Sequence, residues 1–241
     1  MDFSRPWARF ALLVSVLCLS YLSYPMPGSA EDILGGKLEK KDTRSDAEIK
    51  ASISRLEKQA AADPKNYRLM FDLANEYVKG HNEDKAKAMY EKAIIANPKY
   101  VQAMVNLGSL YSDLEEHDEA IKWYEKALSV DPENCKARSN LGNVYYAMQR
   151  YPDAMFEYRR AVQQDPKCES AMYNIAVAFA DAGLFREAVS WWKKVEKVAP
   201  GTEAARSARE NIDILDRFTQ PPQQAKSKTP SGSSKASSKP K

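Results

Sequence analysis

Side chains able to hold a metal ion or to act as nucleophiles are few and scattered in this sequence of 241 residues. The two histidines, His81 and His117, are predicted in turns between helices, and neither has a Cys, Asp or second His at metal-ligand spacing. Ser190 and Lys193 have the Ser-x-x-Lys spacing of penicillin-recognising enzymes, but two tryptophans lie between them and the companion motifs are absent. There is no Gly-rich phosphate loop and no Cys-x-x-Cys-His sequence. We therefore expect no catalytic residue, no metal site and no cofactor, and we expect that the protein is not an enzyme.

Prolines divide the sequence into units of equal length. Five of them recur at an interval of 34 residues, each after Asp, Asn or Ala: Pro64, Pro98, Pro132, Pro166 and Pro200. Self-similarity at this period indicates a stack of helical hairpins, in which each unit buries its apolar face against the next. The units are residues 67–100, 101–134, 135–168 and 169–202. The function is therefore to be sought on a surface that the stack forms.

Within each unit, two sets of positions predict two amphipathic helices. Positions seven, eight and eleven contain Leu or Ile, then Gly or Ala, then Tyr or Phe. Positions twenty, twenty-four and twenty-seven contain Ala, then Tyr or Trp, then Ala or Val. We expect the Gly or Ala at position eight to face the Ala of the second helix, so that two small residues set the distance between the helices.

This pattern resembles the tetratricopeptide repeat (TPR), with its small residue at position eight, Ala at twenty, aromatic residue at twenty-four and Pro at thirty-two. The resemblance covers residues 67–202 and implies an all-α fold, a right-handed α-α superhelix (TPR solenoid) of four tandem repeats. It also implies a noncatalytic protein that binds a protein or peptide partner. Arg138, Glu83 and His117 depart from the pattern, because large apolar or aromatic residues are usual there, and we expect loose packing around them.

A segment that can cap the stack flanks each end of the repeats. Residues 45–63 are predicted to form an N-terminal flanking helix, because Ser45 and Glu48 make a capping box before apolar residues at helical spacing. Residues 202–219 are predicted to form a C-terminal capping helix with Thr202 as its N-cap, which gives ten helices in all. Self-association is an alternative role for the apolar residues of that last helix: Ile212, Ile214, Leu215 and Phe218.

The first thirty residues match a secretory signal peptide. Arg5 and Arg9 precede an apolar run at residues 10–24, and the small residues 28–30 form a cleavage site. We expect cleavage after Ala30, export, and a bacterial periplasm as the compartment of the mature chain. The alternative is an inner-membrane anchor formed by residues 10–24, although this run is shorter than the ~20 residues that span a bilayer. Residues 31–44 are predicted to be a flexible linker.

The formal net charge of +3 is unevenly distributed along the chain. Residues 220–241 contain five lysines and no acidic residue, and their Pro, Ser, Gln and Lys composition predicts disorder. Residues 31–219 have a formal charge of about −3, which argues against a nucleic-acid surface on the repeats. The tail is interpreted either as a solubilising linker or as a weak contact to anionic headgroups, acidic polymers or a negatively charged partner.

Cys135 and Cys168 are the two cysteines outside the leader, and an exported protein can form disulfides. Cys18 lies within the apolar run after the bulky Leu17, so we expect no lipidation there. The repeat register places Cys135 at the start of one first helix and Cys168 just before the next. Packed helices lie ~8–10 Å apart, whereas bridged Cα atoms lie within ~7 Å. We therefore expect two free thiols.

On each first helix, positions two, five, six, nine and twelve lie opposite the packed face and are predicted to line a concave groove. The candidate partner-binding residues are Arg68, Phe71, Asp72, Asn75, Gln102, Val105, Asn106, Ser109, Lys136, Asn140, Asn143, Tyr146, Tyr173 and Asn174. Asn106, Asn140 and Asn174 recur at position six, and an amide offers a donor and an acceptor to an extended peptide. The alternative is that these amides bond to neighbouring backbone, as Asn at positions six and nine does in idealised repeats.

In TPR domains of the carboxylate-clamp type, Lys, Asn and Arg side chains hold the C-terminal carboxylate of a chaperone. Asn75, Asn106 and Lys136 match this pattern, but Phe71 and Asn140 stand at two of the cationic positions. We therefore expect no carboxylate clamp, because two of the three cations that would pair with the carboxylate are missing.

The leading hypothesis for function is a noncatalytic scaffold that binds a partner peptide or protein in its groove and supports assembly of an envelope complex. An alternative is an accessory subunit of an envelope enzyme system, for polysaccharide or cytochrome assembly. A self-associating scaffold is the other alternative.

Overall fold

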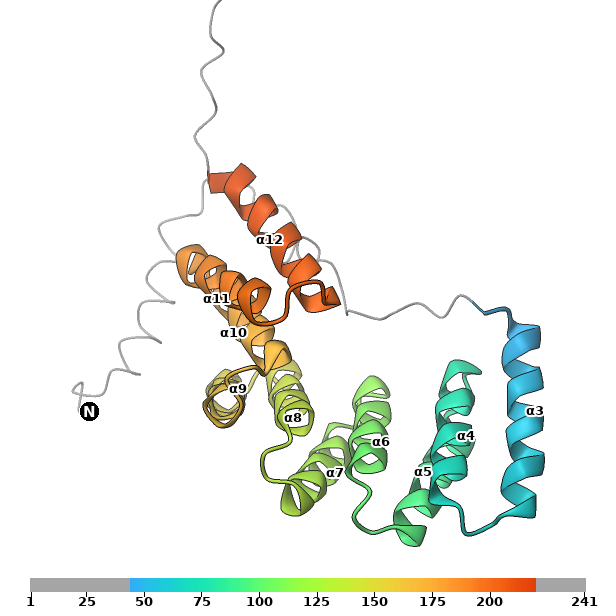
Figure 1. Cartoon of the computed structure of the whole chain (residues 1–241). Coiled ribbons are helices and arrows are strands. Elements are labelled where there is room, and N and C mark those ends of the chain that lie inside the picture. The colour runs from blue at the N-terminus through green and yellow to red at the C-terminus, as the bar shows by residue number, and fades with distance from the viewer. Residues whose placement is uncertain (1–43, 220–241) are drawn as a thin grey trace, which may run out of the picture.

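The structure is a computed structural model that describes residues 44–219, and these residues form ten α-helices and no strand (Figure 1). In chain order the helices are α3 (Asp46–Ala62), α4 (Tyr67–Lys79), α5 (Glu83–Ala96), α6 (Val101–Asp113), α7 (His117–Val130), α8 (Cys135–Ala147), α9 (Tyr151–Gln164), α10 (Glu169–Asp181), α11 (Phe185–Val198) and α12 (Glu203–Thr219). The predicted leader and tail, and the linker before Arg44, lie outside the described residues. The prediction of an all-α fold is confirmed.

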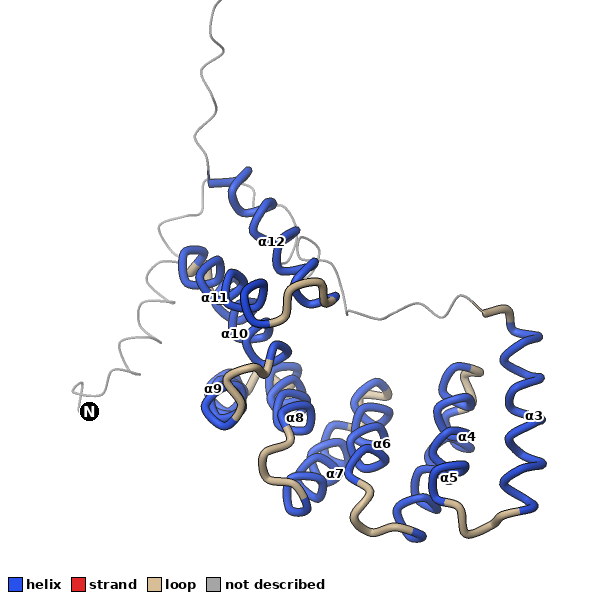
Figure 2. The backbone as a smooth tube through the Cα atoms, in the orientation of Figure 1, coloured by secondary structure: helices blue, strands red, loops and turns tan. Residues whose placement is uncertain are grey.

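The helices pair into four hairpins, α4 with α5, α6 with α7, α8 with α9 and α10 with α11. Short loops join successive helices (Figure 2), and the hairpins stack in a curved row with α3 against α4 and α12 against α11. The first helices α4, α6 and α8 lie on the inner side of the curve, and α5, α7 and α9 lie on its outer side (Figure 1). This arrangement is the predicted right-handed α-α superhelix.

Both ends of the stack are closed by helices that bury one face. Ser45 caps α3 as predicted, because the N–H of Glu48 donates to Ser45 Oγ (3.3 Å) and the N–H of Ser45 donates to Glu48 Oε2 (2.7 Å). On α12, Ile212 and Leu215 are buried against the chain itself. The prediction that these two residues support self-association is therefore wrong, because the protein's own core already covers them.

In the second and third repeats, the glycine at position eight makes room for an aromatic ring. A Cβ atom added at Gly108 lies 2.8 Å from the ring of Tyr124, and one at Gly142 lies 2.5 Å from the ring of Tyr158. The nearest neighbour of this space is thus the ring at position twenty-four of the same repeat, a contact that the sequence pattern did not predict. The predicted contact with the Ala of the second helix stays a prediction.

The residues that depart from the repeat pattern are packed, contrary to the prediction for Arg138. Arg138 is 4% exposed, and its Nη1 donates to Glu157 Oε2 (3.0 Å) while its Nη2 donates to the carbonyl of Pro132 (2.7 Å). Glu83 begins α5 and is half-buried. His117 is the first residue of α7 and does not lie in the turn, so its predicted location is also corrected.

The turn inside every hairpin has the same backbone conformation. The residue at position fifteen has a positive φ in all four repeats: 52° at His81, 60° at Glu115, 60° at Gln149 and 73° at Gly183. In the third hairpin, the N–H groups of residues 149 and 150 donate to the carbonyls of Tyr146 (2.9 Å) and Tyr145 (2.8 Å), which is the Schellman arrangement. Glycine adopts this conformation at low cost, yet three of the four turns use another residue.

Cys135 and Cys168 form a disulfide, so the prediction of two free thiols is wrong. Their Cα atoms are 5.8 Å apart, at the first residue of α8 and at the N-cap of α10. The expected spacing of ~8–10 Å applies to helix axes. Each Cα lies ~2.3 Å from its own axis, so facing Cα atoms of packed helices come within bridging distance. The bond fastens the first helices of the third and fourth hairpins together.

Replacing Gln149 by Gly should raise the free energy of unfolding by about 1 kcal/mol, because a left-handed conformation costs a residue with a Cβ roughly 1–2 kcal/mol. The opposite change, Gly183→Ala, should lower it by a similar amount. Urea unfolding followed by circular dichroism measures both. As a control, Gln163→Gly on the exposed face of α9 should destabilise; a Gln149→Gly variant that also loses stability would contradict this account of the turn.

Reducing the Cys135–Cys168 bond should lower the free energy of unfolding by about 3–4 kcal/mol, because the bond restricts a loop of 33 residues in the unfolded chain. Thermal unfolding with and without a phosphine reductant measures the difference. The reductant should not change the melting temperature of the Cys135→Ala, Cys168→Ala double variant. Equal melting temperatures for the oxidised and reduced wild type would exclude a stabilising bond.

Candidate functional site

Side chains able to ligate a metal ion are dispersed over the described part of the chain. Residues 44–219 contain no group of three or more His, Cys, Asp or Glu side chains able to hold a metal ion. Ser190 and Lys193, which have the spacing of a catalytic pair, are both exposed on α11. None of the helices within residues 44–219 combines the length and the apolar composition needed to span a membrane. The search for a site therefore turns to the surfaces of the array.

The predicted groove residues lie on α4, α6, α8 and α10, and we call the side of these helices that faces the inside of the curve the inner surface (Figure 1). Their accessibility differs. Exposed members are Arg68, Asp72, Gln102, Lys136 and Asn143; half-buried members are Phe71, Asn75, Asn106, Ser109, Asn140, Tyr146, Tyr173 and Asn174. Val105 is only 2% exposed and packs in the core, so this candidate is withdrawn as a contact for a partner.

The amides of the inner surface are hydrogen-bonded between neighbouring repeats. In the first two repeats, Asn75 Oδ1 accepts from the buried hydroxyl of Tyr90 (2.5 Å) and from Nδ2 of Asn106 (3.0 Å). The acceptor is at position nine, the tyrosine at position twenty-four of the same repeat, and the second amide at position six of the next. The bond from Asn106 therefore crosses the repeat boundary on the inner surface.

The same three-way contact occurs twice more. Ser109 Oγ accepts from the hydroxyl of Tyr124 (3.1 Å) and from Asn140 Nδ2 (3.2 Å). Asn143 Oδ1 accepts from the hydroxyl of Tyr158 (2.8 Å) and from Asn174 Nδ2 (2.6 Å). We call these three contacts the inter-repeat ladder. The interpretation that the position-six amides bond to neighbouring backbone is therefore corrected, because their partners are side chains of the preceding repeat.

The ladder ends at the fourth repeat, where its residue types change. Position nine is Val177 and position twenty-four is Trp192, which is 0% exposed and whose Nε1 has no hydrogen-bond partner within residues 44–219. The next polar contact is made by the capping helix, because Asn211 Nδ2 donates to the hydroxyl of Tyr173 (3.0 Å). The repeated polar pattern of the inner surface is therefore confined to α4, α6, α8 and α10.

Part of the amide capacity remains available to a ligand. Asn106 and Asn140 donate to the ladder acceptors Asn75 Oδ1 and Ser109 Oγ, and each amide also donates to the hydroxyl of the tyrosine in that contact. Within residues 44–219 their Oδ1 atoms accept no hydrogen bond, so each of these side chains retains its acceptor oxygen. Asn174 likewise makes a second contact, because its Nδ2 also lies 3.4 Å from Ser139 Oγ.

The aromatic candidates of the inner surface are engaged with neighbours. The ring of Phe71 lies 5.1 Å from that of Tyr100 and 5.8 Å from that of Tyr90, measured between centroids. Tyr146 donates its hydroxyl to the carboxylate of Asp181, and burial together with this bond raises the pKa of the Tyr146 hydroxyl. These side chains therefore stabilise the repeats, and the exposed polar members of the inner surface are Arg68, Asp72, Gln102, Lys136 and Asn143.

Sequence reasoning missed the tyrosines of the ladder, which were assigned to packing alone. Burial raises the pKa of Tyr90 and of Tyr124 to about 12, and it also raises that of Tyr158. All three hydroxyls are therefore protonated donors at neutral pH. The signal that predicts them is the combination of Tyr at position twenty-four, a polar residue at nine, and Asn at six of the next repeat.

The raised pKa values predict a loss of stability in alkaline solution. Since the folded pKa of Tyr90 and Tyr124 is about 12 against an ordinary value of 10.0, their contribution is complete below pH 10 and is lost as the pH rises towards 12. The Tyr90→Phe, Tyr124→Phe variant should lose about 1 kcal/mol per hydrogen bond at pH 7 and should show a weaker alkaline decline. Urea unfolding from pH 7 to 11.5 tests this, and an unchanged slope would contradict it.

Comparison with known proteins agrees with this geometry. Models described as TPR repeat match residues 108–149 and 142–183, and models described as tetratricopeptide repeat match residues 67–100 and 89–122. A search of curated proteins gave no match.

Two solved structures share the fold. A crystal structure of MamA has a TM-score of 0.54 and 24% identity, over 66% of this chain and 96% of that one. MamA residues 41 to the end, from Desulfovibrio magneticus RS-1, gives 0.53 and 13%, over 64% and 88%. Repeat proteins of this kind are generally noncatalytic scaffolds for protein–protein interaction. With four hairpins in register and matching family models, this chain belongs to the tetratricopeptide repeat family.

Proposed function

We propose that the protein is a noncatalytic scaffold that holds an extended segment of a partner protein on its inner surface. One observation carries the proposal: the ladder fixes Asn106 and Asn140 while leaving the acceptor oxygen of each amide available. An extended peptide presents N–H groups along its main chain, which such oxygens can accept. The exposed cation of Lys136 adds a point for a carboxylate of the same segment.

The ladder favours binding because its hydrogen bonds order the amide side chains before a partner binds. A side chain that becomes ordered on binding costs roughly 0.5–1.5 kcal/mol, and the amides of the ladder have already lost that freedom on folding. Their orientation is set by the acceptors at position nine, Asn75 Oδ1 and Ser109 Oγ, to which they donate. The inner surface is therefore preorganised for a main chain.

We further propose that the scaffold is exported and supports assembly of a complex in a bacterial envelope. The leader pattern of residues 1–30 supports this location. So does the Cys135–Cys168 bond, because disulfides persist in oxidising compartments. Crosslinking in intact envelopes, followed by mass spectrometry, should recover the same partner as the purified chain does.

Capture of a partner from an envelope extract tests the inner surface. The Asn106→Ala, Asn140→Ala variant should retain less than about one-tenth of the partner bound by the wild type, because two hydrogen bonds to its main chain are lost at ~0.5–1.5 kcal/mol each. The matched control is Tyr90→Phe, Tyr124→Phe. It removes bonds to the same two acceptors, but from the buried side, so the inner surface keeps its amides.

The two variants separate binding from stability. Both lose a ladder bond at Asn75 and at Ser109, so thermal unfolding should show similar destabilisation. Only the Asn variant should lose the partner. Loss of the partner in both variants, or retention in both, would reject the inner surface as the binding site.

A further inference from the structure

The outward face of the second helices differs between the two halves of the array. In repeats three and four, positions 22, 25, 26 and 29 are all exposed and hold five cations and no carboxylate: Phe156, Arg159, Arg160, Gln163, Ser190, Lys193, Lys194 and Lys197. We call these eight residues the basic outer face. The same positions of α5 and α7 contain Glu91 and Glu125 among three lysines, so the charge there is mixed.

Three acidic residues beside the basic outer face are paired with cations outside it. Glu157 on α9 accepts from the buried Arg138 (3.0 Å), and Glu196 on α11 accepts from Arg209 Nε (2.9 Å). Asp153, near the start of α9, accepts from Arg150 Nε (2.8 Å). These three carboxylates therefore compensate cations that do not belong to the face.

A hollow at the edge of this face concentrates part of the charge. It has a volume of 390 Å³, and it is lined by Lys167, Lys194 and Lys197 above the apolar side chains of Met172 and Val198. No carboxylate lines it. Three ammonium groups around one opening favour an anionic group such as a phosphate, and the apolar floor accepts the carbon atoms attached to it.

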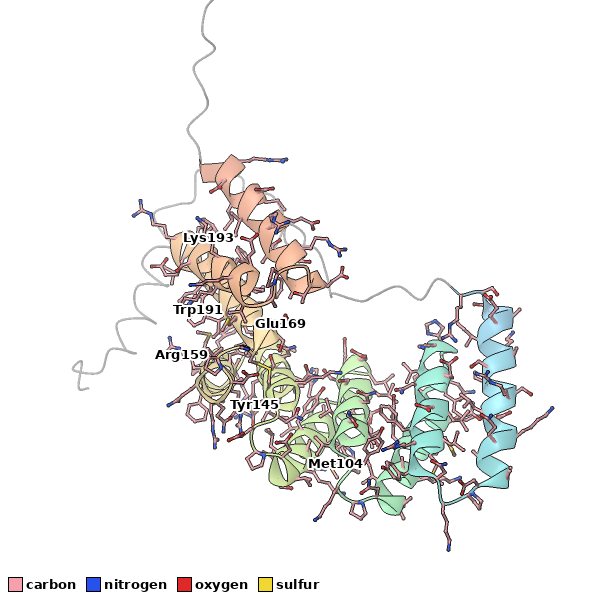
Figure 3. The ribbon with its side chains drawn as sticks, in the orientation of Figure 1. Met104, Tyr145, Arg159, Glu169, Trp191 and Lys193 are labelled. Atoms are coloured by element: carbon pink, nitrogen blue, oxygen red, sulfur yellow. A yellow bond between two sulfur atoms is a disulfide. The ribbon has the colours of Figure 1, made fainter. Side chains whose placement is uncertain are left out.

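Aromatic side chains lie among the cations. Phe156 is 61% exposed and, on α9, it stands three and four residues before Arg159 and Arg160, so all three share one helical face. The ammonium of Lys194 lies 3.6 Å from the ring centroid of Trp191. Figure 3 shows Arg159, Trp191 and Lys193 along α9 and α11, on the side turned away from the inner surface. Cations with an exposed aromatic ring are typical of surfaces that touch lipid headgroups.

We propose that the basic outer face docks the protein on a membrane surface rich in anionic phospholipids. The face lies on the outer side of the curve, whereas a folded acidic partner would need a matching concave surface. Lipid headgroups move laterally and adapt to charges spread over two helices. Each Lys or Arg near such a surface adds to the attraction, and Phe156 enters the interfacial layer.

Docking in this way leaves the inner surface open. The basic outer face is on α9 and α11, and the available amide oxygens of Asn106 and Asn140 are on α6 and α8, on the other side of the array. A membrane and a protein partner therefore bind at the same time, and the scaffold presents its partner at the membrane surface. The lipid contact does not depend on the identity of that partner.

Vesicle cosedimentation tests the docking with residues 31–241, which include every core cluster found within residues 44–219. Vesicles of phosphatidylcholine with one-third phosphatidylglycerol should bind the protein, and pure phosphatidylcholine should not. The Arg160→Glu, Lys193→Glu, Lys197→Glu variant should bind at least about 100-fold more weakly, since each surface cation contributes roughly fivefold. Phe156→Ala should weaken binding about tenfold.

The control has the same change of charge in the other half of the array. Lys92→Glu, Lys122→Glu, Lys126→Glu replaces three cations at the equivalent positions, and its binding should remain within about threefold of the wild type. Repeating all measurements with residues 31–219 removes the lysines of the tail, and the difference between the two triple variants should persist. Thermal unfolding verifies that both remain folded.

Three results would overturn the proposal. The first is equal binding of the wild type and the Arg160, Lys193, Lys197 variant, and the second is an equal loss in both triple variants. The third is binding of poly-glutamate, but not of vesicles, with the same dependence on the basic outer face. That last result would assign the face to an acidic protein partner instead.

Discussion

The tyrosine at position twenty-four connects the packing of this array to its inner surface. Its ring fills the space beside position eight, so tightly that a Cβ at Gly142 would lie 2.5 Å from the ring of Tyr158. Its hydroxyl, at the other end of the same side chain, reaches position nine of the first helix (2.8 Å from Asn143 Oδ1). The glycine therefore fixes the ring, and the ring fixes the polar atom that the next repeat contacts.

This connection makes the inner surface a property of the stack rather than of single side chains. Asn174 reaches across to Asn143, Asn140 to Ser109 and Asn106 to Asn75, so each amide is oriented by the repeat before it. A buried polar group must find a partner, and the ladder satisfies three buried tyrosine hydroxyls in this way. In the fourth repeat, Trp192 and Val177 remove both the hydroxyl and its acceptor, and stacking there depends on apolar contacts with α12.

The sequence predicted the helices well because the 34-residue period and the apolar columns both act over short distances. The hairpins, the Ser45 capping box and the flanking helices follow from such local signals. The left-handed turn at position fifteen could not be predicted from such local signals. In three repeats this position is not glycine but His81, Glu115 or Gln149, which do not indicate a positive φ. The disulfide was missed because helix-axis spacing is not the spacing of two facing Cα atoms.

The sequence predicted which residues lie at the candidate site, but not the contacts and burial of their side chains. Sequence patterns placed the amides on the inner surface, whereas their partners, the burial of Val105 and the contacts of Phe71 depend on the distance between repeats. A single sequence does not specify that distance to the accuracy that a hydrogen bond requires. The difference in charge between the two halves of the outer side could be predicted from the repeat register alone. Position twenty-five faces outwards in every repeat, and it is acidic in the first two (Glu91, Glu125) but basic in the last two (Arg159, Lys193).

The two proposed ligands, a partner segment on the inner surface and anionic lipid on the basic outer face, are held by different interactions. Amides act over hydrogen-bond distances and respond little to salt, whereas the charges of α9 and α11 act over the Debye length of ~8 Å at physiological ionic strength. A ligand of one face therefore does not compete with a ligand of the other, either for space or for the same interactions. The Cys135–Cys168 bond joins α8 to α10, which carry the inner surface, so it holds the helices of Asn140 and Asn174 together without involving α9 and α11. Separate faces allow a scaffold to bind two ligands independently. If the two faces were energetically coupled, the affinity for one ligand would depend on whether the other was bound.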